Sequence, residues 1–188
     1  INKKFTDQIP TAGVSKHGIG MQLTINPNFY EALSEDHRYG LIKHELLHIA
    51  FGHLILRDLY SDHKLFNIAA DLEINQYILE SKLPTGGLLL SSFPELNLPT
   101  KAGTKKYYEL LEQAQQDGTS PSLDSLMNKM DGESQYCHAT WEEFDELPEA
   151  DKKLMQKQID HQLKESAEQT QKKQGTIPGE LADLIHRL

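Results

Sequence analysis

The chain has 188 residues, of which 38% are apolar and 25% are charged, and its formal net charge at pH 7 is −9. This length suits one domain with a sizeable core, no apolar run approaches the ~20 residues of a membrane-spanning helix, and the acidity argues against a nucleic-acid surface. The single cysteine, Cys137, excludes an intramolecular disulfide and an all-cysteine zinc site. We therefore expect a cytoplasmic protein that would hold any metal with histidine and carboxylate side chains.

The N-terminal part of the sequence predicts one strand followed by helices. Residues 1–18 are mostly polar and are interrupted by proline and glycine, which is typical of an irregular lead-in. Apolar residues then alternate with small or polar ones over 18–26, which predicts a half-buried strand that ends before Pro27. A short helix is expected over 28–33, and Ser34 suits the N-cap of a longer helix.

Further helices are expected in the middle of the chain. Ser61 or Asp62 can cap a third helix that reaches about Leu79, before a proline and a pair of glycines. Residues 84–104 are typical of a loop, and a helix over about 104–116 follows it.

The C-terminal part is more polar. A linker at 117–122 leads to a poorly patterned segment. Residues 148–174 predict an exposed, charged helix with one apolar stripe, and 180–188 predict a last amphipathic helix. The stripe consists of Leu154, Ile159 and Leu163. The fold class that follows is α+β and mostly helical, with a core over 1–147 and a helical C-terminal extension over 148–188.

The motif HELLH places His44 and His48 in a long helix that is apolar on every side from Leu41 to Leu56. At i and i+4, two imidazoles share one helix face about 6 Å apart, so both can reach one zinc ion at ~2.0–2.1 Å. Glu45 projects about 100° away, which suits a general base acting on water. The alternative is a pair of core histidines without metal. Burying these three side chains without partners is costly, however, and a metal supplies the partner.

A catalytic zinc takes three protein ligands, so a third must come from elsewhere. Asn67, Asp71 and Asn75 form a polar row at i, i+4 and i+8 on an otherwise apolar helix. The connection between the two helices is short enough to bring Asp71 against the histidines. We expect Asp71 to be the third ligand and Asn75 to orient a ligand from the second shell. Glu73 faces away from Asp71, and a purely structural Asp71 is the alternative.

His53 is a weaker candidate for the metal. The glycine and histidine that follow the motif do not fall at the offsets of the extended pattern HExxHxxGxxH. On a continuous helix His53 would point about 180° from His44. We therefore expect His53 to be a capping or hydrogen-bonding residue.

These residues resemble a family of zinc metallopeptidase domains of the zincin type, found ahead of von Willebrand factor A-like domains in bacterial and phage proteins. The resemblance is carried by HELLHIAFGHLILRD at 44–58 and NIAADLEIN at 67–75, with weaker matches at 23–29, 105–111, 138–141 and 175–185. It implies a zincin-like fold with a small β-sheet beside the metal-bearing helix, and it matches Asp71 to the family's carboxylate. It also implies a von Willebrand-like domain after Leu188 and a ring ATPase as a partner.

The sequence therefore predicts a zinc-dependent endopeptidase, a hydrolase in which Glu45 helps water attack a peptide carbonyl. We expect the strand over 18–26 to pair with an extended peptide or protein substrate, and His138 to stabilise the oxyanion with Trp141 packed nearby. Cys137 could approach the metal as a thiolate, although a buried inert cysteine is the expected state.

Two other functions remain open from the sequence. One is a non-catalytic, zinc-containing interaction module that docks on a partner such as a ring ATPase, and the other is an enzyme with a different metal-assisted hydrolysis. A fourth protein ligand on the zinc, either His138 or His53, would favour the non-catalytic module.

Overall fold

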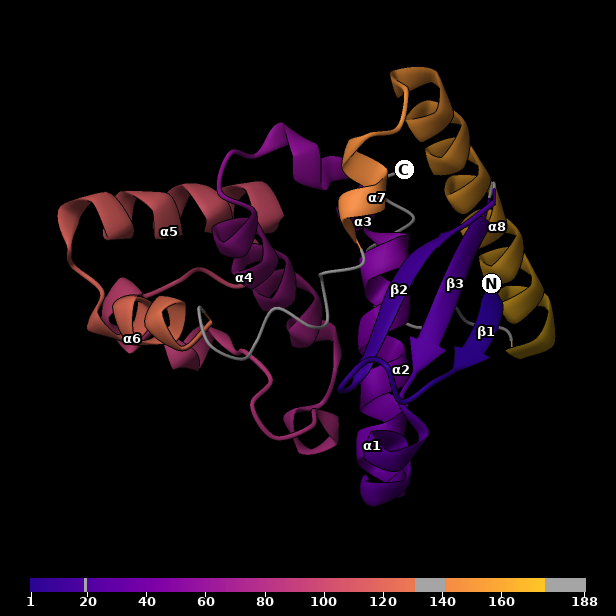
Figure 1. Ribbon diagram of the computed structural model, residues 1–188, viewed down its shortest axis with the longest axis horizontal. Coiled ribbons are helices and arrows are strands. Elements are labelled where there is room, and N and C mark those ends of the chain that lie inside the picture. The colour runs from indigo at the N-terminus through magenta and orange to yellow at the C-terminus, as the bar shows by residue number, and fades with distance from the viewer. Residues whose placement is uncertain (19, 131–140, 175–188) are drawn as a thin grey trace.

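The computed structural model describes residues 1–18, 20–130 and 141–174 of the chain (Figure 1). Its strands are β1 (Asn2–Phe5), β2 (Ala12–His17) and β3 (Gly20–Ile25). Its helices are α1 (Pro27–Ala32), α2 (Glu35–Ala50), α3 (His53–Leu56), α4 (His63–Ile74), α5 (Thr104–Asp117), α6 (Pro121–Met130), α7 (Glu142–Asp145) and α8 (Glu149–Gln174). The short 3₁₀ helices η1 (Arg57–Leu59) and η2 (Asn75–Tyr77) flank α4. This confirms the α+β, mostly helical class, and none of the described helices has the length and apolar character to cross a membrane.

The described strands form one small sheet in the order β1-β3-β2, in which β3 runs parallel to β1 and antiparallel to β2. The prediction of an irregular lead-in over 1–18 is wrong, because β1 and β2 lie there. All of β1 is exposed, so backbone pairing rather than buried side chains holds it, and it leaves no pattern in the sequence. The prediction that the strand over 18–26 pairs with substrate is also wrong, because neighbours bond to both edges of β3.

The sheet buries one face against α2 (Figure 1). Met21, Leu23 and Ile25 of β3 alternate into the core, as the sequence predicts. Val14 of β2 lies opposite Leu23 in the register and is fully buried. β2 is an edge strand of the sheet, and α2 packs against it. The HELLH residues of α2 therefore lie beside β2.

α2 begins where the sequence predicts but ends earlier. The hydroxyl of Ser34 accepts a backbone N–H of the first turn, which confirms the N-cap. After α2, Gly52 adopts a left-handed φ of 72°, a conformation that residues with side chains rarely take. The chain therefore changes direction before α3, and the prediction of one continuous helix to Leu56 is wrong. Burial on every side holds only in part, since Leu46 is 38% exposed.

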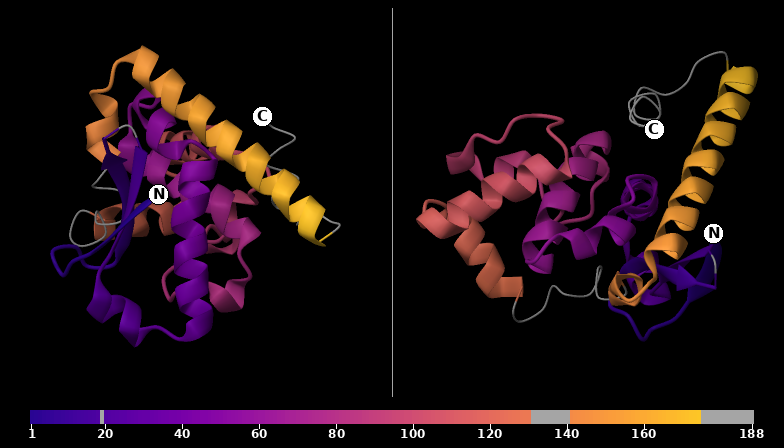
Figure 2. Two further views of the ribbon diagram at one scale, coloured as in Figure 1. Left: turned by 90° about the vertical axis from the view of Figure 1, so that its right-hand side faces the viewer. Right: turned by 90° about the horizontal axis from the view of Figure 1, so that it is seen from above.

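α4 lies beside α2, and α5 packs against α4 on the side away from the sheet (Figures 1 and 2). Asp62, one of the two predicted caps, accepts the backbone N–H of Leu65 at 2.9 Å. The helix gives way to η2 after Ile74, before the predicted end at Leu79. This arrangement brings Asp71 of α4 and Asn75 of η2 against the histidines of α2.

The sequence does not predict α6 (Pro121–Met130), because its first two residues fall in the linker expected over 117–122. The hydroxyl of Ser120 accepts the N–H of Leu123 at 3.2 Å and donates to the carboxylate of Glu95 at 2.6 Å. Ser122 also donates to Glu95, and these bonds lower the pKa of the Glu95 carboxyl to about 2. The start of α6 thus depends on a residue from a distant loop, which local patterns do not reveal.

Buried charges tie α7 and α8 to the segment after α3. Nη1 of Arg57 donates to Oδ2 of Asp145 at 2.8 Å, and Lys152 of α8 pairs with Asp58. Arg57 and Lys152 are both buried, so each of these pairs replaces the hydration that the side chains lose. The pairs fix α7, and with it Trp141, close to α3.

α8 confirms the predicted helix over 148–174, but its apolar stripe differs by one residue. Leu154 is 52% exposed, and Met155 takes its place beside Ile159 and Leu163. Met155, Ile159 and Leu163, together with Leu46 of α2, line an apolar groove of about 330 Å³. The amphipathic helix predicted over 180–188 lies outside the described residues.

Gly40 lies where α2 touches the backbone at Lys82. An added Cβ would stand 1.8 Å from the carbonyl oxygen of Lys82, and backbone on both sides cannot easily yield. We expect Gly40→Ala to lower the free energy of unfolding by about 3 kcal/mol. Urea unfolding measures this, with Gly20→Ala as the control because a Cβ there would make only an ordinary 3.7 Å contact. Equal stability of the two variants would contradict the prediction.

Candidate metal centre

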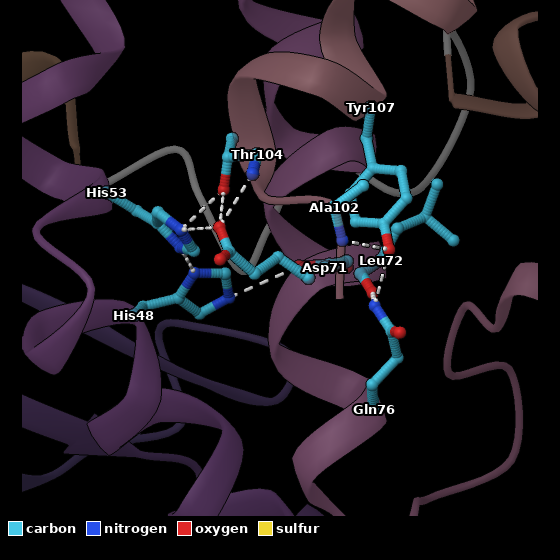
Figure 3. Close-up of polar contacts among 9 residues, drawn as sticks. His48, His53, Asp71, Leu72, Gln76, Ala102, Thr104 and Tyr107 are labelled. Carbon is cyan, nitrogen blue, oxygen red and sulfur yellow. Dashed lines mark hydrogen bonds and ion pairs between the residues drawn. The ribbon is translucent and has the colours of Figure 1, made fainter. Parts of the chain in front are cut away.

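Three predicted side chains converge from α2 and α4. Nε2 of His48 lies 3.2 Å from Oδ1 of Asp71 (Figure 3). The same nitrogen lies 3.0 Å from Nε2 of His44. Nε2 of His44 lies 3.7 Å from the same carboxylate oxygen. Ligand atoms at ~2.0–2.1 Å from a tetrahedral zinc stand roughly 3.3 Å apart, so these separations fit a single ion. Among the described residues, His44, His48 and Asp71 form a group that could hold a metal.

Asn75 orients His44 through a hydrogen bond to Nδ1, the ring nitrogen that does not face Asp71. Its Nδ2 donates to the carbonyl of Leu88 at 2.8 Å, so its Oδ1 is left to accept the Nδ1–H of His44 at 2.8 Å. A neutral His44 then presents the bare Nε2 to Asp71 and His48. Carboxylate oxygen and bare imidazole nitrogen are both acceptors, and a cation between them removes their mutual repulsion. Asn75 has the position expected of a residue that orients a ligand.

His53 lies behind the other imidazole. Its Nδ1 is 2.9 Å from Nδ1 of His48, and its Nε2 is 2.9 Å from the hydroxyl of Thr104 (Figure 3). The expectation that His53 points away from the motif is therefore wrong, because Gly52 turns the chain back. Both ring nitrogens of His53 have partners, which confirms a hydrogen-bonding histidine.

Glu73 stands next to this second imidazole. Its carboxylate accepts the backbone N–H of Thr104 at 2.7 Å and the Thr104 hydroxyl, and it lies 3.7 Å from Nε2 of His53. Glu73 does face away from Asp71, as expected. Its contacts with Thr104 and His53 were missed, because they join residues that are distant in the sequence. The glycine at 52 and the threonine at the start of the predicted helix were the only local signals.

Glu45 is the buried acid of the site. It is 1% exposed and lies between β2 and the side chains of His44 and Asp71, and the backbone of Val14 forms a hydrogen bond with it. Burial raises the pKa of the Glu45 carboxyl to about 7, with a further rise from Asp71 and opposing effects of His44 and Val14. Within the described part of the chain its Oε1 has no hydrogen-bond partner. A buried acceptor without a partner beside a metal-binding group suits a water molecule held between them.

A pocket of about 190 Å³ opens beside His44, Glu45 and Asp71. The rest of its lining is mostly apolar or glycine: Thr11, Phe29, Leu41, Leu83, Pro84, Thr85, Gly86 and Gly87. The Glu45 carboxyl, the His44 imidazole and the Asp71 carboxylate are therefore reached from one hollow of the surface.

Trp141 is fully buried and packs edge-on against His48, with ring centroids 4.8 Å apart. It covers the His48 imidazole, so the predicted packing of Trp141 near the site is observed. His138 and Cys137 lie outside the described residues, and their predicted roles stay predictions.

The fold and the site together define an α+β protein with a histidine–histidine–carboxylate group of the kind that metallopeptidases use. Residues 6–187 match the model of a family described as "Putative metallopeptidase domain", and the chain belongs to this family. A search of curated proteins and a search of solved structures each return no match. The family confirms the resemblance seen in the sequence and implies a metal ion and a peptidase. The von Willebrand-like neighbour and the zincin-like arrangement stay predictions.

Proposed function

We propose that the protein is a zinc-dependent endopeptidase in which His44, His48 and Asp71 hold the metal and Glu45 is the general base. The observation that carries this proposal is the buried Glu45 carboxylate, whose Oε1 lacks a partner among the described residues, beside three converging donor atoms. Two imidazole nitrogens and one carboxylate oxygen suit zinc, whereas magnesium and calcium favour oxygen ligands alone. Zinc, when bound, supplies Lewis-acid chemistry that polarises a carbonyl and makes water more acidic.

In this reaction Glu45 would transfer the proton and Trp141 would shield the site from water. Glu45 accepts a proton from the attacking water at its unpartnered oxygen and later gives it to the leaving amine nitrogen. The raised pKa of Glu45, about 7, suits a group that must both take and give a proton near neutral pH. Trp141 and the apolar core behind His48 exclude bulk water from one side of the site.

Removing the metal is expected to abolish cleavage of an unfolded test protein such as reduced casein, and adding zinc to restore it. The chelator 1,10-phenanthroline would be used first and then removed by dialysis before zinc is added. Cleavage is followed on gels and by mass spectrometry of the products. Full activity of the metal-free protein would rule out the proposed function.

The pocket predicts which bonds are cut. Phe29, Leu41, Leu83 and Pro84 give it an apolar lining, and about 190 Å³ accommodates one side chain of roughly leucine size. We expect the cleaved bonds to adjoin apolar residues, and Phe29→Ala to shift the preference roughly tenfold towards larger side chains. Sequencing the products from a peptide library measures both. Tyr39→Ala is the control, because Tyr39 is exposed and does not line the pocket. Cleavage next to charged residues by wild type and Phe29→Ala alike would contradict this prediction.

A further inference from the structure

We propose that Glu73, acting through Thr104 and His53, sets the tautomer of His48 and so leaves its Nε2 unprotonated towards the metal. The proposal rests on the metal centre described above. It makes Glu73, Thr104 and His53 positioning residues, because none of them is among the metal-binding residues.

The direction of the hydrogen bonds is fixed at the carboxylate end. Glu73 is 4% exposed and receives both the backbone N–H and the hydroxyl of Thr104. Thr104 is the first residue of α5, and the positive end of a helix favours an ionised carboxylate. A carboxylate can only accept, so the hydroxyl hydrogen of Thr104 must point to Glu73.

The Thr104 hydroxyl determines which ring nitrogen of His53 carries the hydrogen. With its hydrogen given to Glu73, the hydroxyl oxygen can only accept from Nε2 of His53, 2.9 Å away. Nε2 of His53 therefore carries the hydrogen, and a neutral imidazole has only one. Glu73 is 3.7 Å from this nitrogen, too far for a direct hydrogen bond, so the Thr104 hydroxyl is the link.

His53 in turn determines the tautomer of His48. Their Nδ1 atoms lie 2.9 Å apart, and a hydrogen bond between two nitrogens needs a hydrogen on one of them. Since Nδ1 of His53 is bare, Nδ1 of His48 is the donor. Nε2 of a neutral His48 is then bare, and this is the atom that faces His44 and Asp71.

Burial keeps water from competing with this chain of bonds. His48, His53, Glu73 and Thr104 are all buried, and the rings of Phe51 and Phe66 lie against His53. In such surroundings each hydrogen bond is stronger and an unmatched donor is costly, so one direction of the whole chain is favoured. The positive φ values of Gly52 and Gly103 shape the backbone that carries His53 and Thr104 into place.

The test reads the His48 tautomer directly in the metal-free protein, by long-range ¹H–¹⁵N NMR of the histidine rings. Wild type is expected to carry the hydrogen on Nδ1 of His48. Glu73→Met removes the acceptor, so Thr104 can donate to His53 and the His48 tautomer becomes mixed or reversed. Zinc affinity, measured by competition with a chelator, should then fall roughly ten- to a hundredfold. The matched control Glu73→Gln keeps an acceptor oxygen and should behave as wild type.

A second pair of variants provides the test if Glu73→Met does not fold. Thr104→Val removes the linking hydroxyl and should give the same mixed tautomer, whereas Thr104→Ser keeps the hydroxyl and should match wild type. A single His48 tautomer and unchanged zinc affinity in Glu73→Met, or in Thr104→Val where Glu73→Met does not fold, would overturn the proposal. Peptide cleavage is not part of this test. A wild type that binds no zinc, or binds zinc without cutting peptides, would instead count against the proposed function.

Discussion

Replacing Glu45 by glutamine is expected to slow peptide hydrolysis by at least about 100-fold while the protein still binds one zinc ion. Glutamine keeps the size of the side chain in this buried position, so the fold and the metal-binding residues should be little disturbed. It cannot accept the proton of the attacking water, which is the role that the buried carboxylate beside His44 would perform. Loss of rate without loss of metal is the combination that identifies a general base.

Steady-state rates on a peptide substrate, together with zinc content by mass spectrometry, separate the two effects. Glu35→Gln is the control, because Glu35 lies exposed in the first turn of the same helix and should leave both quantities unchanged. A Glu45→Gln variant as fast as wild type would mean that another group takes the proton. Loss of zinc would mean that Glu45 helps to hold the metal.

Asp71→Ala is expected to weaken zinc binding by more than the roughly 10–100-fold that losing an outer-sphere partner costs. The carboxylate oxygen is 3.2 Å from Nε2 of His48 and 3.7 Å from Nε2 of His44, so its removal leaves two neutral ligands. Cleavage should be lost as well. Asn67→Ala, one turn earlier on the same helix, is the control and should retain the metal.

Trp141 provides a direct readout of this loss. It is the only tryptophan in the sequence, and its ring lies against His48. Cobalt(II) bound at the site should quench its fluorescence, so a titration gives the affinity of each variant. Equal quenching curves for wild type and Asp71→Ala would show that Asp71 is not a ligand.

The parts of the site that rest on local helical spacing could be predicted from the sequence. His44 and His48 share a helix face, and Asp71 and Asn75 share another, so the 3.6-residue period was enough to propose the group. The Ser34 and Asp62 caps follow from the same local chemistry. The structure brings these side chains together, and their roles in binding metal await experiment.

Features that depend on distant contacts could not be predicted. β1 is an exposed edge strand, and the start of α6 depends on Glu95 from another loop. The hydrogen bonds that link His48 to His53, Thr104 and Glu73 join residues of α3, α4 and α5, which lie far apart in the sequence. Gly52 was visible in the sequence, but its left-handed conformation was not, and the direction of His53 follows from it.

Several predictions of wider context stay untested. The cytoplasmic location, a von Willebrand-like neighbour and a ring ATPase partner stay predictions from the sequence. The division of the chain into a core over 1–147 and an extension over 148–188 is also a prediction.

The choice between an enzyme and a non-catalytic zinc module depends on how many protein ligands the metal has. His53 does not serve as the fourth, because His48 and Thr104 engage both of its ring nitrogens. A catalytic centre keeps one position for water, whereas a structural centre is closed by the protein.

The most direct test is a crystal structure of the zinc-loaded protein, with anomalous data collected on both sides of the zinc absorption edge. We predict one zinc ion bound by Nε2 of His44, Nε2 of His48 and a carboxylate oxygen of Asp71, with no fourth protein ligand. A zinc ion closed by a fourth side chain would contradict the peptidase, and the absence of zinc from these three residues would contradict the metal centre itself.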